Sequence, residues 1–87
     1  MEAKPVIFSF PNGTLVYNEG TSEANNLFFL SPAGEKLWQM KEVAPANDCA
    51  TLVKKEGDDA FYFATFFGLS FTIDAATLKA KEKGFVK

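Results

Sequence analysis

The chain has 87 residues, of which 47% are hydrophobic, 15% aromatic and 23% charged, and nine lysines against eleven acidic residues leave a net charge of −2. This length is enough for one small globular domain. The absence of histidine and the single cysteine, Cys49, exclude histidine-based nucleophile systems, an internal disulfide and multi-cysteine zinc sites.

Other features of the sequence argue against nucleic-acid and membrane partners. The chain has no arginine, and therefore no planar fork for bidentate recognition of phosphate or guanine, and its pI is about 5.0. Residues 1–5 lack the basic start of a secretory signal, so we expect none. The two longest uncharged stretches, residues 5–18 and 60–73, are shorter than the roughly 20 apolar residues of a membrane-spanning helix. We expect a cytoplasmic protein with no cofactor, no nucleic-acid partner and no membrane partner.

Aromatic and β-branched residues alternate with a period of two in the first half of the chain, which is typical of strands. The pattern predicts four strands, at residues 6–10, 14–18, 27–30 and 36–43. Residues 11–13 form a turn sequence, and residues 19–26 are too polar for a core and indicate a loop. Because residues 27–30 are apolar on both faces, we expect them to form a central strand that is covered on both sides or to lie at a subunit contact.

The second half repeats this pattern after a Pro-containing linker. It predicts strands at residues 49–55, 61–66 and 69–73, and a last strand within residues 74–84. A helix at residues 75–83 is the alternative for the last segment, because Asp74 could cap it and Gly84 could end it. Leu78 is almost its only large apolar residue, so such a helix would bury little, and we favour a turn and a strand. Residues 48–57 allow a weaker helix alternative.

The fold class that we predict is all-β, with about eight short antiparallel strands in one domain. The strands fall into two four-stranded units, pseudo-repeats over residues 5–43 and 49–87, packed as a small sandwich or a half-propeller. At a shift of 43 residues, Phe28 falls on Phe71 and Leu30 on Ile73. Repeats of this length with four strands each are the spacing of propeller blades.

Two segments resemble a known repeat. Residues 67–79 and residues 30–38 are similar to the blade motif of quinoprotein-type β-propellers, with a glycine turn, an alternating strand, small residues and a second turn. The second copy departs from the motif at Leu78, where the family has its turn glycine, and the first has Ser31 in place of an aspartate. The resemblance implies shape and carries over no catalytic residue. Two blades cannot close a ring, so it implies a compact sandwich or an oligomer.

The C-terminal half also resembles small acidic β-rich bacterial immunity proteins in size, composition and texture. With the lack of catalytic groups, this favours a non-enzymatic protein-binding domain, such as an immunity-type inhibitor that blocks one protein partner. The alternative is a two-blade propeller unit that self-associates and binds a small ligand such as a carbohydrate. The carbohydrate hypothesis requires an exposed Trp38 or Tyr62 side chain on which a sugar could stack. Amide and acidic side chains, such as those of Asn25, Asn26 and Asp74, would have to lie beside it.

Candidate partner-binding residues are of two kinds. The aromatic residues Trp38, Tyr62, Phe66 and Phe67 could anchor a partner, since aromatic side chains dominate binding hot spots, although they also serve cores. The second kind are acidic residues at turns, which could face a basic partner or simply be solvated: Asp48, Glu56, Asp58, Asp59 and Asp74. Of these, Asp58 and Asp59 are the partner-binding candidates. Together with Glu56 they sit in a short solvated turn, so we predict no enzymatic activity from them and no metal site.

Two further features have structural interpretations. Lys79, Lys81 and Lys83 are expected on one face of the last strand, where lysines prevent pairing between the edges of sheets. Cys49 lies beside Ala50 and near Leu52, which favours a buried small residue over a reactive thiol.

Overall fold

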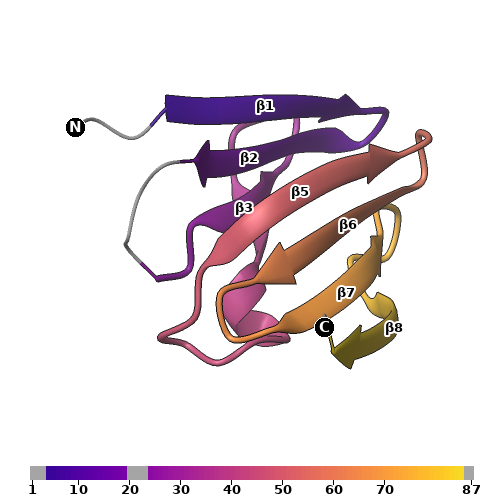
Figure 1. Cartoon of the computed structure of the whole chain (residues 1–87). Coiled ribbons are helices and arrows are strands. Elements are labelled where there is room, and N and C mark those ends of the chain that lie inside the picture. Colours follow the sequence, from indigo (N-terminus) through magenta and orange to yellow (C-terminus); the bar gives the residue numbers. More distant parts are fainter. Residues whose placement is uncertain (1–3, 20–23, 86–87) are drawn as a thin grey trace.

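The structure is a computed structural model that describes residues 4–19 and 24–85. Two antiparallel sheets of four strands each pack against one another, and in each sheet the strands lie in sequence order (Figure 1). The first sheet contains β1 (Lys4–Phe10), β2 (Gly13–Glu19), β3 (Leu27–Leu30) and β4 (Lys36–Gln39). The second contains β5 (Ala50–Glu56), β6 (Ala60–Thr65), β7 (Leu69–Asp74) and β8 (Ala80–Phe85). The predicted all-β sandwich is confirmed.

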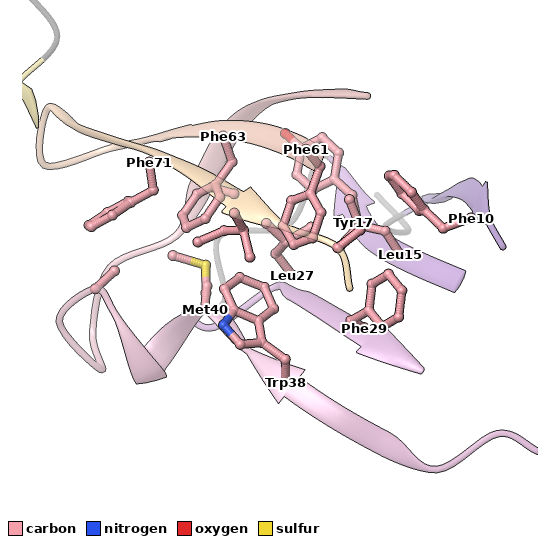
Figure 2. Close-up of a cluster of buried hydrophobic side chains, with 14 residues drawn as sticks. Phe10, Leu15, Tyr17, Leu27, Phe29, Trp38, Met40, Phe61, Phe63 and Phe71 are labelled. Atoms are coloured by element: carbon pink, nitrogen blue, oxygen red, sulfur yellow. The ribbon is translucent and has the colours of Figure 1, made fainter. Parts of the chain in front are cut away.

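The core lies between the sheets and is mainly aromatic (Figure 2). Alternate residues of the central strands point into it, among them Leu15 and Tyr17 of β2 and Phe61 and Phe63 of β6. Phe61 is fully buried at its centre. Its ring centroid lies 5.3 Å from that of Trp38, 5.9 Å from Phe10 and 6.2 Å from Phe29, so one side chain joins three strands of the facing sheet.

The first hairpin requires a residue without a side chain at Gly13, the first residue of β2. Any Cβ at Gly13 would collide with the Leu30 carbonyl oxygen and the Phe29 ring. Glycine therefore allows the first hairpin to approach β3 closely.

Polar side chains also join the two halves. The Asn26 side chain is buried; its Oδ1 accepts from the Ala50 N–H at 2.7 Å, and its Nδ2 donates to the Ala50 carbonyl at 3.1 Å and the Asn18 carbonyl at 3.3 Å. The Asn12 side chain donates to the Ala75 carbonyl. Each end of the first sheet is thus hydrogen-bonded to the second half of the chain.

The predicted fourth strand, residues 36–43, is wrong in its second half. β4 ends at Gln39, and Met40–Glu42 forms a short 3₁₀ helix, η1. The Gln39 N–H donates to Glu42 Oε2 at 3.0 Å, which stabilises the start of η1. Met40 is buried by this change of direction. No helix among the described residues is long and apolar enough to cross a membrane.

The helix alternatives at residues 75–83 and 48–57 are wrong. Residues 75–79 form a turn that leads into β8, and residues 48–57 contain β5. Asp74 Oδ1 accepts from the N–H groups of Ala76 and Thr77, at 2.8 and 3.0 Å, and so closes a turn rather than capping a helix. Leu78 adopts a φ of 59°, in the left-handed region that favours glycine, at the position where the blade motif has its turn glycine. It also packs against the core.

Candidate functional site

The turn between β6 and β7 presents two phenylalanine side chains to solvent. Phe66 is 74% exposed and Phe67 is 48% exposed, and we refer to this pair as the aromatic tip. Their ring centroids lie 6.2 Å apart with an angle of 56° between the planes. Large apolar side chains paired in this way at the end of a hairpin leave an apolar patch that a partner could cover.

The backbone of the tip is held by the linker that precedes β5. The Phe66 N–H donates to the Cys49 carbonyl at 2.9 Å, and the Phe67 N–H donates to Asp48 Oδ1 at 3.2 Å. Gly68 closes the turn with a φ of 85°, and its N–H donates to the Thr65 carbonyl at 3.1 Å. The two rings are therefore carried on a backbone with fixed hydrogen bonds, which reduces the entropy lost on binding.

The Asp48 side chain holds the backbone of the aromatic tip in place. Its side chain is fully buried, and Oδ1 also accepts from the Cys49 N–H at 2.8 Å. Oδ2 is buried and accepts no hydrogen bond from the described residues. A buried carboxylate oxygen without a partner lowers stability, so the local geometry of the tip is maintained at some cost to the fold.

Cys49 is half-buried and carries a free thiol. Burial raises the pKa of this thiol above its ordinary value, and the charge of the Asp48 carboxylate raises it further. The pKa of the buried Tyr17 is also raised above its ordinary value, first by burial and then by the charges of Glu19 and Cys49. Both groups are thus held in their neutral forms, which does not suit Cys49 for nucleophilic chemistry at neutral pH.

We expect the protein to lose stability in alkaline solution for this reason. A raised pKa in the folded state contributes stability that is present below the pKa of the unfolded chain and is lost as the pH rises through the folded value. The free energy of unfolding, measured with urea, should therefore be lower at pH 9 and pH 10 than at pH 7. Cys49→Ser should remove the part of this fall that belongs to the thiol. An unchanged pH profile in this variant would contradict a contribution from Cys49.

The remaining aromatic candidates lie away from the tip. Tyr62 is half-buried in the middle of β6, and Lys54 Nζ lies 5.9 Å from its ring centroid. Trp38, only 2% exposed, packs in the core with its ring 5.3 Å from Phe61. Trp38 therefore cannot anchor a partner at the surface, and the core interpretation that the sequence also allowed is the correct one.

The acidic candidates lie at the other end of the second sheet. Asp58 and Asp59 occupy the turn between β5 and β6, at the opposite end of β6 from the tip (Figure 1). The six residues of β6 span about 20 Å. Both are exposed, and Asp58 Oδ1 lies 3.1 Å from Lys55 Nζ. The structure thus does not bring the acidic turn and the aromatic tip into one site.

The residues expected for a carbohydrate site are also not assembled. Asn25 Nδ2 donates to Gln39 Oε1 at 2.7 Å, and its Oδ1 accepts from the Lys41 N–H at 3.0 Å. Asn26 is buried between the halves, and Asp74 closes the turn before β8. These side chains hold loops together. Within residues 4–19 and 24–85, no three Cys, Asp or Glu side chains gather where they could hold a metal ion.

The sequence points to Phe66 and Phe67 but not to Asp48 as their support. By sequence Asp48 belongs with the solvated turn acids, because a charged residue after a Pro-containing linker is usually exposed. A signal does exist, since Asp is one of the residues that accept hydrogen bonds from neighbouring backbone N–H groups. The contact with Phe67, however, depends on the tertiary fold.

Comparison with known proteins adds no relative to this picture. The resemblances to propeller blades and immunity proteins therefore stay predictions. No protein-family model matches the chain, and no curated protein or solved structure was found that is significantly similar to it.

Proposed function

We propose that this protein is a non-enzymatic binding domain that attaches to one protein partner through the aromatic tip. The observation that carries the proposal is the exposure of Phe66 and Phe67 on a backbone held by Asp48 and Cys49. Preorganised aromatic side chains supply large contact areas at a small entropic cost, which is the usual character of a binding hot spot.

Within this class we propose an immunity-type inhibitor that acts in the cytoplasm. The small size and the net charge of −2 support a role against a basic partner. Asp58 and Asp59 lie too far from the tip to share its contacts, so we assign them an effect on the rate of encounter. A charge at this distance acts through the long-range field, which salt screens.

The test of this proposal is the simultaneous replacement of Phe66 and Phe67 by alanine. Affinity for a partner that the wild-type chain binds stoichiometrically should fall about 30-fold or more, because hot-spot truncations cost about 2 kcal/mol or more. Isothermal titration calorimetry would measure the change, and circular dichroism would confirm that the variant folds.

Leu37→Ala combined with Leu52→Ala is the matched control, because both leucines are 48% exposed, as Phe67 is. This control should bind as the wild type does. Asp58→Asn combined with Asp59→Asn should slow association at low salt and leave dissociation unchanged. Equal affinity of the wild type and the Phe66/Phe67 variant would refute the proposed site.

A further inference from the structure

β1 forms an open edge of the first sheet and is unusually apolar for an exposed edge. Between Pro5 and Phe10 it contains no charged residue. Val6 and Phe8, which face the core side, are only half-buried, and Ile7 on the opposite face is 54% exposed. A long edge strand with apolar residues on both faces is a template for pairing with another strand.

The other three edges have features that oppose such pairing. β4 has only four residues and a bulge opposite Phe29 and Leu30, and β5 has a bulge at Ala50–Leu52 and the charged run Lys54, Lys55, Glu56. β8 is irregular in its pairing with β7 and contains two lysines and a glutamate. Among the described edges, only β1, the strand at the top of Figure 1, is long, regular and free of charge over most of its length.

The hydrogen-bond pattern shows which backbone groups of β1 point away from the sheet. The Asn18 N–H donates to the Asn26 carbonyl at 2.9 Å, toward the β3 side, so Asn18 and its β1 counterpart Pro5 exchange no hydrogen bond. Because the pattern alternates along an antiparallel pair, Ile7 and Ser9 also direct their N–H and carbonyl groups outward. Pro5 also lies at an outward-facing position, so the N–H that proline lacks is not required for pairing with β2.

We propose that β1 pairs antiparallel with β1 of a second copy of this chain, about a two-fold axis at Ile7. In this register the two Ile7 residues exchange a pair of hydrogen bonds, and each Ser9 N–H donates to the Pro5 carbonyl of the other copy. Because Pro5 has no N–H to donate, the Ser9 carbonyl is the only one of these outward-facing groups that stays hydrogen-bonded to water. The interface is self-complementary, as a two-fold axis requires.

The side chains favour this register over its neighbours. Ile7 is the midpoint of Lys4–Phe10, so all seven residues of the strand are paired. Val6 of one copy lies opposite Phe8 of the other on the core side, and an aromatic side chain opposite a β-branched one is a favourable cross-strand pair. A register centred on Phe8 would leave Lys4 and Pro5 unpaired. The second copy thus extends the first sheet from four to eight strands and covers the exposed parts of Val6, Ile7 and Phe8.

Sedimentation equilibrium of the full chain, from about 1 to 500 μM, measures the association directly. We expect a dimer of about 19 kDa, twice the 9.6 kDa of one chain. Ile7→Lys places two ammonium groups opposite each other at the axis and should raise the dissociation constant at least tenfold. Leu52→Lys is the matched control, because Leu52 is 48% exposed on the other sheet, and it should leave the dimer unchanged.

Cross-linking tests the register itself, in a Cys49→Ser background. In the proposed pair the two Cα atoms at position 7 lie about 5.5 Å apart, within reach of a disulfide. Ile7→Cys should therefore form covalent dimers on mild oxidation. Ser9→Cys should not, since the two positions are about 13 Å apart along the strands. A monomer at 500 μM, an assembly that Ile7→Lys leaves intact, or equal cross-linking of both variants would overturn the proposal.

Discussion

Phe61→Ala is expected to remove about 3–5 kcal/mol from the free energy of unfolding. Phe61 is fully buried, and its ring contacts Trp38, Phe29 and Phe10 on the facing sheet. Loss of the ring leaves a cavity where the two sheets meet, because the close-packed side chains around it can relax only in part. Stability of about 0.05–0.15 kcal/mol per residue gives about 4–13 kcal/mol for 87 residues, so this one change could consume most of it.

Urea denaturation followed by circular dichroism measures this loss, and Phe66→Ala is its chemical control. The control removes the same ring from a side chain that is 74% exposed, and should change stability by less than about 0.5 kcal/mol. Similar losses in both variants would show that Phe61 does not occupy the centre of the core.

Asn26→Leu is expected to lower the free energy of unfolding by about 2–5 kcal/mol, although leucine has nearly the same size. The substitution leaves the buried Ala50 N–H and carbonyl without their partner and also removes the bond to the Asn18 carbonyl. Each buried backbone group that loses its hydrogen bond costs about 1–3 kcal/mol. Asn26 joins the halves of the chain, so its loss also weakens the packing of one sheet on the other.

Thermal unfolding of Asn26→Leu and Asn47→Leu would separate this role from a general effect of an apolar substitution. Asn47 is exposed in the linker just before Asp48, and its replacement should leave the melting temperature within about 2 °C of that of the wild type. Asn26→Asp keeps an acceptor for the Ala50 N–H but loses the donor to the carbonyls, so it should also destabilise. Wild-type stability of Asn26→Leu would contradict the proposed link.

The strands were predictable because their pattern is local. Alternation of large apolar residues marks β1, β2, β6 and β7 in the sequence, since one face of each strand is buried between the sheets. The end of β4 was not predictable in the same way. The segment after Gln39 continues to alternate, but Met40 reaches the core by a turn of 3₁₀ helix.

The candidate site was predictable only in part. Phe66 continues the aromatic run of β6, so its exposure depends on where the strand ends, and that is decided by hydrogen bonds to Cys49 and Asp48. By residue type, Trp38 is as typical of a core as of an interface. Only the fold, which places Phe61 of the facing sheet against the Trp38 ring, decides in favour of the core. Contacts between the halves of the chain are absent from a local pattern, which explains why Asn26 and Asp48 could not be recognised.

The order of the strands bears on how the chain reaches its native state. In each described sheet every strand is bonded only to its neighbours in the sequence, so both sheets can grow outward from their own hairpins with little loop-closure entropy. Contacts such as those of Phe61 with Phe29 and Trp38 form only when the two meanders meet. We therefore expect the docking of the two halves, rather than strand pairing, to limit the rate of folding, and the linker after η1 to set how often the halves collide.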